Sequence, residues 1–466
     1  MGIGGLTSLI GLFNNRIFRI PDYQRGYAWG RHEIEEFWDD LSNLNLGKID
    51  YHYTGLLTLE EVTREEVESV ERWKDDLWIF DRGFHACYIV DGQQRLVTLL
   101  ILIRVILDRF TGDTAISFYH KDDLIKKFFY EEIGPYQTDI FGYEKNSSSY
   151  SYFKRHIVGW DDPSFSEDAP TDLYTENLKA AQAFFREKTE NFTPEKLEVI
   201  LRKMIHSLKF HIYDIDDELE VFLRFETINN RGKELTTLEL LKNRLIYLTS
   251  LLSEEENAKK ELRHRINEVW KTIFELMGKQ KDHPLDEEEF LLNHWIMYFN
   301  ASYKKNSESY VRFLLNRYFL AKNVSEEGGL VKIGYNQIQN YIESLLLGVQ
   351  SWFAMHYPTV SDFGKEKKDA LARMVRIGYG FYKPLILAAM VKEADEKQLA
   401  GLLSVIYRFE LTMTRLHIRK SKFLEARFFM MANSFYRQNG GLDFEEMKKY
   451  IEKMRDDELS RALFIR

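Results

Sequence analysis

The feature that most constrains the fold is a long apolar run in the first quarter of the chain. Residues 96–107 read LVTLLILIRVIL, in which Arg104 is the only charged residue. A helix that is apolar on all sides has to be buried, and this run is too short to span a bilayer. The polar pentapeptide DGQQR at 91–95 separates it from the β-rich segment 78–90. The pattern therefore predicts a strand, a polar loop and a central helix.

Composition and charge limit the kinds of partner and compartment. The chain carries 64 Lys and Arg residues against 73 Asp and Glu residues, a formal net charge of -9. Any contact with DNA therefore requires a local basic patch. The single cysteine, Cys87, excludes an internal disulfide framework and a Cys-rich zinc site. Because the first residues lack the pattern of a signal peptide and no long apolar span follows, we expect a cytoplasmic protein that does not enter the membrane.

Strand and helix patterns divide the chain into three regions. β-rich runs at 51–60 and 78–90, the latter with a hairpin turn at Asp-Arg-Gly 81–83, predict a small α/β unit over residues 1–110. Residues 111–250 are mostly helical, with a return strand at 211–215. Residues 251–466 predict a helical domain that binds DNA or a partner. The predicted fold class is α+β, a small N-terminal α/β unit followed by a large, mostly helical region.

The DGQQR loop has the chemistry of an anion site. Main-chain N–H groups at a helix N-terminus are unpaired and attract anions. Gly92 lets the backbone approach a ligand, Gln93 and Gln94 both donate and accept, and Arg95 can bind a phosphate through two N–H groups. Asp91 can hold a divalent cation or orient a water. The alternative is structural: Asp91 caps the helix and Arg95 pairs with a surface acid.

A second segment, FRIPDYQRGYAW at residues 18–29, combines aromatic rings with an amide and a guanidinium group. Tyr27 and Trp29 fit a packing role, in which they fix the N-terminal helix on the sheet. Gln24 and Arg25 have less structural reason to be there, and they are candidates to contact a ligand.

A third segment, FETINNRGKELTTLELLKNRLI at residues 225–246, contains a tight turn between two helical patterns. Asn229, Asn230 and Arg231 in this turn can contact phosphate or ribose. The alternative is a plain helix connector, because Asn and Gly are common in such turns.

The three segments together resemble the family of domains found in the GmrS half of GmrSD modification-dependent restriction systems and in related phage-defence proteins such as SspE. The family pattern is I-P-x-Y-Q-R-x-Y-x-W, then D-G-Q-Q-R-L-x-T-L, then I-N-x-R-G-x-x-L-T. These motifs read here at residues 20–29, 91–99 and 228–236, in the same order. The resemblance covers roughly residues 6–246.

The resemblance implies a core similar to ParB and sulfiredoxin that hydrolyses nucleoside triphosphates, with Mg²⁺ as the expected cofactor. By position it assigns catalysis to Asp91, Gln93, Gln94 and Arg95. It assigns nucleotide binding to residues of all three motifs, namely Gln24, Arg25, Gly92, Thr98, Asn229, Asn230 and Arg231.

The implied function is that of an NTP-hydrolysing sensor in an antiviral restriction system, where nucleotide turnover gates recognition or cleavage of foreign DNA. The expected partners are double-stranded, modified DNA, an HNH nuclease and a second copy of the chain in a homodimer. The alternative is a non-catalytic nucleotide- or DNA-binding module that recruits a separate nuclease.

The chain departs from many family members in lacking a recognisable HNH nuclease pattern, in which clustered His and Asn residues surround a metal. The nearest candidate, DHPLDEEEFLLNHW, contains His283, Asn293 and His294. Residues 286–298 predict one helix, which leaves no room for the two strands of an HNH finger. The metal ligands stay unknown, and we expect the nuclease to be a separate or fused partner.

A basic and aromatic segment near the C-terminus, TRLHIRKSKFLEARFFMMANSFYRQ, is the candidate DNA surface. The alternative is a pair of amphipathic helices whose basic side chains lie over the core. The candidate DNA-binding residues are Arg415, Arg419, Lys420, Lys422 and Arg427.

Overall fold

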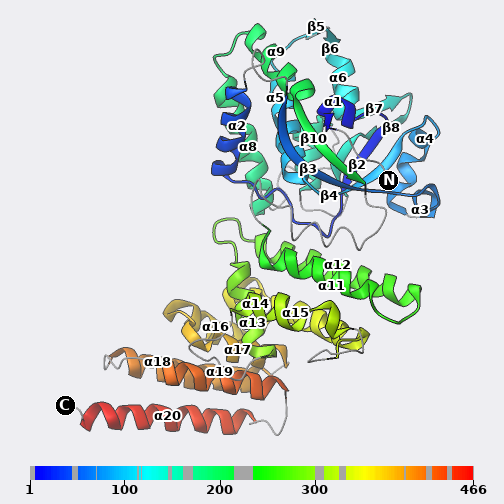
Figure 1. Ribbon diagram of the computed structural model, residues 1–466. Helices are drawn as coiled ribbons and strands as arrows, with labels where there is room; N and C mark the ends of the chain where they lie inside the picture. The colour runs from blue at the N-terminus through cyan, green and yellow to red at the C-terminus, as the bar shows by residue number, and fades with distance from the viewer. Residues whose placement is uncertain are drawn as a thin grey trace. The chain divides into compact units, whose positions relative to one another are not determined.

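The computed structural model describes most of the chain, and the described residues form two compact units. Residues 1–234 with 278–284 make the first unit, and residues 235–277 with 285–466 make the second. The predicted α+β class is confirmed (Figure 1). The described ranges are 6–44, 51–69, 71–112, 115–116, 118–144, 149–160, 172–214, 235–299, 309–324, 332–392, 395–415, 422–437 and 443–464.

A six-stranded sheet organises the first unit, in the order β1-β10-β3-β4-β2-β9. Strand β2 is parallel to both β4 and β9, whereas β3 is antiparallel to β4 and parallel to β10. The strands predicted at 51–60 and 211–215 are present as β3 and β10. The strand bounds are β1 Leu6–Ser8, β2 Arg16–Ile20, β3 His52–Glu61, β4 His85–Asp91, β9 Phe141–Tyr143 and β10 Leu208–Asp214.

Helix α5 (Gln93–Leu107) is the central helix of this unit, as the apolar run predicts. Every residue from Leu96 to Leu107 except Arg104 is buried. The sheet it supports is completed by β9 and β10, so the α/β unit extends well past residue 110. The remaining helices and strands of the unit are α1 Leu9–Leu12, α2 Arg31–Asn43, α3 Arg64–Ser69, α4 Leu77–Phe80, β5 Ala115–Ile116, β6 Tyr119–His120, α6 Lys121–Phe128, β7 Tyr130–Ile133, β8 Tyr136–Asp139, α7 Tyr150–Phe153, α8 Leu173–Thr189 and α9 Pro194–Arg202.

One local prediction is wrong: the residues before the turn at 81–83 form helix α4 rather than a strand. Ile79 of α4 is fully buried. The ring of Phe80 lies edge-on to that of Trp73 at 5.9 Å between centroids. Short apolar runs fit either a helix or a strand, and tertiary packing decides between them. The turn itself is present and joins α4 to β4.

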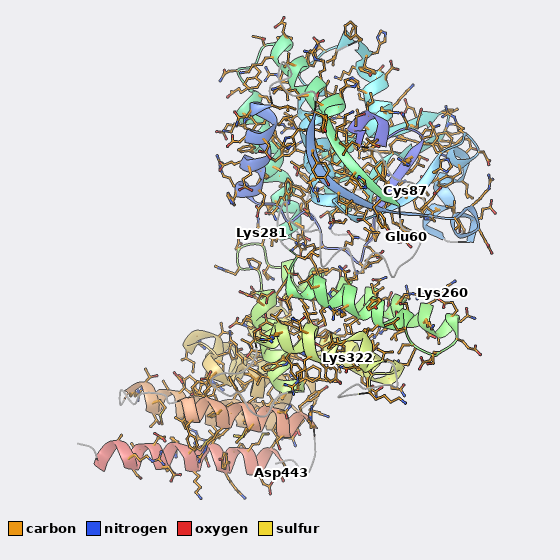
Figure 2. The ribbon with its side chains drawn as sticks, in the orientation of Figure 1. Glu60, Cys87, Lys260, Lys281, Lys322 and Asp443 are labelled. Atoms are coloured by element: carbon orange, nitrogen blue, oxygen red, sulfur yellow. The ribbon has the colours of Figure 1, made fainter. Side chains whose placement is uncertain are left out.

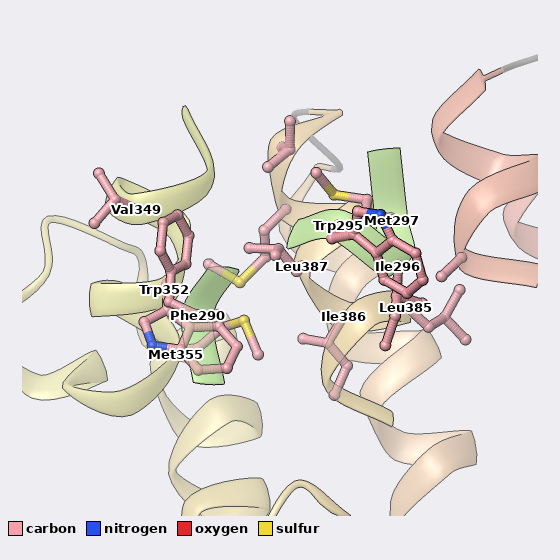
Figure 3. Packing of buried hydrophobic residues seen from close by; sticks show 14 of the residues in the cluster. Phe290, Trp295, Ile296, Met297, Val349, Trp352, Met355, Leu385, Ile386 and Leu387 are labelled. Carbon is pink, nitrogen blue, oxygen red and sulfur yellow. The ribbon is translucent and has the colours of Figure 1, made fainter. Parts of the chain in front are cut away.

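The second unit is helical throughout its described residues, with α17 (Lys383–Val391) at its centre. Every residue of α17 from Pro384 to Val391 is buried. Figure 3 shows side chains of α17 among those of α13 (Glu287–Tyr298) and α15 (Tyr335–His356). The sequence-based boundary at residue 250 falls at the end of α11, a helix of this unit. The other helices are α11 Thr237–Ser250, α12 Glu256–Gly278, α14 Tyr310–Phe313, α16 Lys365–Ile377, α18 Glu396–Arg415, α19 Lys422–Arg437 and α20 Phe444–Phe464.

Short 3₁₀ and π segments connect or extend these helices. None of the described helices combines the length and the apolar character that a bilayer span requires. Cys87 lies buried on β4 (Figure 2). The short segments are η1 Glu71–Asp76, η2 Lys154–Val158, η3 Lys203–Ser207, η4 Leu314–Tyr318, η5 Ala321–Asn323, η6 Pro358–Val360 and η7 Gly380–Tyr382.

Candidate functional site

The first two motifs meet at one edge of the sheet, because the parallel strands β9, β2 and β4 all end there. Asp91 is the last residue of β4. Glu144, which follows β9, is 7% exposed and accepts a hydrogen bond from the N–H of Asp22 at 2.9 Å. The start of β3 reaches the same edge, since Thr58 lies opposite Asp91 in the antiparallel pair. Open sheets bind ligands at the carboxyl ends of parallel strands, so this edge is the candidate site.

Gly92 makes the turn from β4 into α5. Its φ of 91° lies in the left-handed region, and a Cβ at this position would fall 2.2 Å from Cδ2 of Leu57. No side chain caps the helix, and its first turn contains no acidic residue. The main-chain N–H groups of the first turn, with the positive end of the helix dipole, therefore favour a bound anion.

Two glutamines join the motifs through the main chain. Gln94 Oε1 accepts from the N–H of Ala28 at 2.8 Å, and its Nε2 donates to the carbonyl of Gly26 at 3.1 Å. Gln24 reaches in the opposite direction, since its Nε2 donates to the carbonyl of Ile89 at 2.9 Å. Both amides therefore bond to main-chain groups, and these bonds hold the two loops against each other.

Thr98 supports this arrangement from the core. It is fully buried, its Oγ1 donates to the carbonyl of Gln94 at 2.8 Å, and it lies 2.7 Å from Oη of Tyr27. Burial raises the pKa of Tyr27, which keeps the phenol protonated. Asn177 fixes the same loop by donating to the carbonyl of Tyr27 at 3.0 Å. The structure thus places Thr98 beneath the DGQQR loop.

Gln93 differs from the other two amides. Its Nε2 donates to the carbonyl of Arg25 at 3.3 Å, and Arg25 itself is 7% exposed. Its Oε1 is shielded from solvent and has no hydrogen-bond partner within the described part of the chain. A shielded oxygen without a donor is costly, so this atom is a natural acceptor for an enclosed water.

Arg95 connects the loop to β3. Its Nη1 donates to the carbonyl of Thr54 at 3.1 Å, and its Nη2 lies 4.0 Å from Oδ2 of Asp91. Gly55, with φ of 133°, makes room for the guanidinium, because a Cβ there would fall 1.8 Å from Nη1. Burial raises the pKa of Asp91, while Arg95 and the N–H of Gly92 act in the lowering direction. The Asp91 side chain keeps 25% of its surface exposed and can be reached by a ligand.

A pocket next to Arg95 escaped the sequence analysis. It has a volume of about 110 Å³ and lies between α2, the start of β3 and Trp29. Its acidic residues Glu33, Glu36 and Asp40 recur at three- and four-residue spacing, which places them on one face of a helix. The spacing predicts an acidic helix face, but it does not indicate what this face lies against.

His294, the nearest HNH candidate, is a core residue of the second unit. It is fully buried, and its Nε2 lies 3.0 Å from Oγ of Ser344. Burial lowers the pKa of His294 to about 3. His283 belongs to the first unit, and α13 is one helix as predicted. Among the residues that the structure describes, no group of three His, Cys, Asp or Glu could hold a metal ion.

The candidate DNA residues are only partly described. Arg415 is exposed at the end of α18, and the guanidinium of Arg427 lies 4.3 Å from the ring centroid of Phe423, which is 56% exposed. The residues or side chains of the third motif and of the basic segment that lie outside the described part are Asn229, Asn230, Arg231, Arg419, Lys420 and Lys422.

The fold and the first two motifs define a class: an α+β domain with an amide-rich loop, an open helix N-terminus and an arginine at the ends of parallel strands. Residues 9–246 match the family described as GmrSD restriction endonuclease, N-terminal domain. Since the match spans just over half of the chain, the protein belongs to this family and is a component of a restriction system in phage defence. This confirms the resemblance drawn from the motifs. No curated protein matches the chain.

We expect Gln94→Glu to destabilise the first unit by about 1–3 kcal/mol. A carboxylate can still accept from the N–H of Ala28, but it cannot donate to the carbonyl of Gly26. Urea unfolding measures the change. Gln350→Glu, on an exposed position of α15, makes the same charge change and should stay within about 0.5 kcal/mol of the parent. Parent stability in Gln94→Glu would show that the glutamine is not a structural tie.

Proposed function

We propose that this chain binds and hydrolyses a nucleoside triphosphate at the carboxyl edge of its sheet, and that turnover gates the recognition or cleavage of foreign DNA by the restriction system. One observation carries the proposal. The open N-terminus of α5, made by Gly92, stands beside the positioned guanidinium of Arg95 and the partly exposed carboxyl of Asp91. Phosphoryl transfer depends mainly on such positioning and electrostatic stabilisation.

Each group at the site has a separate role in this proposal. The N–H groups of the first turn of α5 bind phosphate oxygens, and Arg95 stabilises the negative charge that develops during transfer. Gln93 ties the loop to the carbonyl of Arg25. Gln94 and Gln24 keep the two loops in place.

Mg²⁺ fits the residues present at this loop. Proteins usually hold Mg²⁺ through one or two carboxylates together with substrate phosphates and waters, and Asp91 supplies a partly exposed carboxyl beside the helix N-terminus. When bound, Mg²⁺ neutralises part of the phosphate charge. Asp91 is the residue that would hold it.

The alternative is a binding module without turnover that recruits a separate nuclease. It is favoured by the bonding of Gln24 and Gln94 to main-chain groups. Because Gln24 and Gln94 are already engaged in these bonds, Asp91 and Gln93 remain as the polar side chains of the loop that could orient an attacking water.

The decisive experiment measures phosphate release by the purified chain with each NTP and Mg²⁺. We expect Arg95→Ala to reduce the rate at least about 100-fold, because a charged donor to the transferring phosphate is lost. Arg31→Ala is the matched control, since Arg31 is exposed and pairs with Glu35 on the same unit. Hydrolysis at the parent rate in Arg95→Ala refutes the site, whereas nucleotide binding without release by the parent favours the binding module.

We further propose that DNA cleavage is performed by an HNH partner, separate or fused. The chain alone should bind modified phage DNA with an affinity that falls steeply with salt, as phosphate contacts require, and should not nick it in Mg²⁺ or Mn²⁺. A plasmid-nicking assay checks this. Metal-dependent nicking by the purified chain contradicts the proposal.

A further inference from the structure

The start of α8 packs against the loop of the first motif. Asn177 donates from Nδ2 to the carbonyl of Tyr27 at 3.0 Å. Tyr174 is 5% exposed, and a Cβ at Gly26 would fall 2.6 Å from Cβ and 2.7 Å from Cγ of this tyrosine. The carbonyl of the same Gly26 accepts from Nε2 of Gln94 at 3.1 Å. The start of α8 and the first turn of α5 therefore hold one glycine between them.

The far end of the Tyr174 side chain meets a segment from a distant part of the sequence. A Cβ at Gly278, the last residue of α12, would fall 2.7 Å from Cε2 and 3.2 Å from Cζ of this tyrosine. Lys281 of the same segment lies 3.8 Å from Oε1 of Glu176 on α8 (Figure 2). Neither end of Tyr174 has room for an added methyl group. Because packed interiors are hardly compressible and transmit strain, a displacement at one end reaches the other.

The segment at residues 278–284 is a short excursion of the chain. It belongs to the first unit, whereas α12 up to Met277 and the whole of α13 belong to the second. The N–H of Leu285 donates to the carbonyl of Met277 at 3.1 Å, so the two ends of the segment are joined. The segment is thus continuous with helices of the second unit at both ends, and covalent bonds pass a displacement of these helices to it.

We propose that Tyr174 couples the nucleotide site to the segment at 278–284, so that the second unit regulates hydrolysis; this inference rests on the proposed function. Displacement of the segment moves Tyr174 and with it Gly26, and the carbonyl of this glycine repositions Gln94 beside Arg95. Tyr174 is therefore a positioning residue that acts through the loop and does not touch the nucleotide. A misplacement of about 1 Å at a reacting group can cost about 100-fold in rate.

Gly278→Ala tests the coupling by placing a methyl group against Tyr174 at a helical position, where alanine is favourable. We expect kcat for phosphate release to fall at least about tenfold. KM should change less than about threefold, because the N–H groups that bind the phosphates remain. Gly401→Ala is the matched control, since Gly401 lies within α18 and a Cβ there would be 3.5 Å from Nζ of Lys448, an ordinary contact. It should hydrolyse at the parent rate.

Tyr174→Leu separates the coupling from plain destabilisation. Leucine keeps the Cβ and Cγ atoms that meet Gly26, and it lacks the Cε2 and Cζ atoms that meet Gly278. In this background Gly278→Ala should have no further effect on kcat, which a double-mutant cycle measures. Urea unfolding checks that each variant is folded under the assay conditions.

Amide hydrogen exchange of the parent chain gives a second measurement that needs no variant. Coupling between two sites is reciprocal, so a bound nucleotide should also act on the segment. A non-hydrolysable analogue of the nucleotide that the parent hydrolyses, added with Mg²⁺, should slow exchange at residues 278–285 by roughly twofold or more. If Gly278→Ala does not fold, this measurement decides alone.

The outcomes separate this inference from the proposed function. A folded Gly278→Ala that hydrolyses at the parent rate overturns the coupling and leaves the nucleotide site standing, as does unchanged exchange at 278–285. An equal loss of kcat from Gly278→Ala in the Tyr174→Leu background overturns the role of Tyr174. Absence of hydrolysis by the parent chain overturns the proposed function and this inference with it.

Discussion

Replacing Gly55 by alanine should reduce nucleotide hydrolysis as far as removing Arg95 does, at least about 100-fold. The new Cβ would fall 1.8 Å from Nη1 and 3.0 Å from Cζ of Arg95. The guanidinium is the far end of a flexible side chain, so it moves away and loses its hydrogen bond to the carbonyl of Thr54. Phosphate release by Gly55→Ala, compared with parent and Arg95→Ala, measures the effect.

Backbone strain needs its own control in this experiment. A side chain at a φ of 133° is strained and costs about 1–3 kcal/mol. Gly83 has a φ of 84°, and a Cβ there would meet nothing within 4 Å. Gly83→Ala therefore introduces strain at a positive φ without moving Arg95, and it should hydrolyse at the parent rate. Unchanged hydrolysis in Gly55→Ala refutes the need for a positioned guanidinium.

Acidification should destabilise the second unit through His294. Burial lowers the pKa of His294 to about 3 in the folded chain, whereas the unfolded chain titrates near 6.5. The unfolded state therefore binds the proton first, so stability is fully present above about pH 6.5 and falls as the pH drops towards 3. The loss is about 1.4 kcal/mol per pH unit, or about 3 kcal/mol at pH 4.

Unfolding curves recorded between pH 7 and pH 4 measure this loss. His294→Gln keeps a polar partner for Ser344 but does not titrate, so its stability should fall less over this range whatever its value at neutral pH. His264 is 71% exposed on α12, and His264→Gln should keep the parent slope. An identical slope in His294→Gln contradicts the role of the buried imidazole.

Local pattern was sufficient for much of the fold. The run at 96–107 could only be a buried helix, and α5 is buried along that stretch except at Arg104. The pattern at 77–80 was insufficient, because four apolar residues fit either a helix or a strand. The full extent of the sheet could not be predicted, since β9 and β10 join it through pairing that is distant in sequence.

The contacts around the DGQQR loop could be predicted only in part. The sequence indicated Gln94 and Arg95 of the loop, and Gln24 of the preceding motif, as candidate phosphate contacts, because their chemistry suits phosphate. It could not indicate that the glutamines bind main-chain groups about 65 residues away in the chain, since any backbone offers the same acceptors and donors. The pocket escaped for a related reason: the partner of an acidic helix face is set by tertiary structure.

The tie between Gln94 and the loop at 26–28 has a consequence for how the two motifs tolerate mutation. Gln94 contacts only a main-chain N–H and a carbonyl, which every residue except proline provides. This contact therefore does not restrict which side chain occupies position 28. Gly26 is restricted for a different reason, because a Cβ would fall 2.6 Å from Cβ of Tyr174 and 2.7 Å from Oγ of Ser149. A saturation scan should therefore show that few substitutions are tolerated at Gln94, whereas many are tolerated at Ala28. Methods that infer contacts from paired substitutions would miss this tie, although it joins the motifs directly.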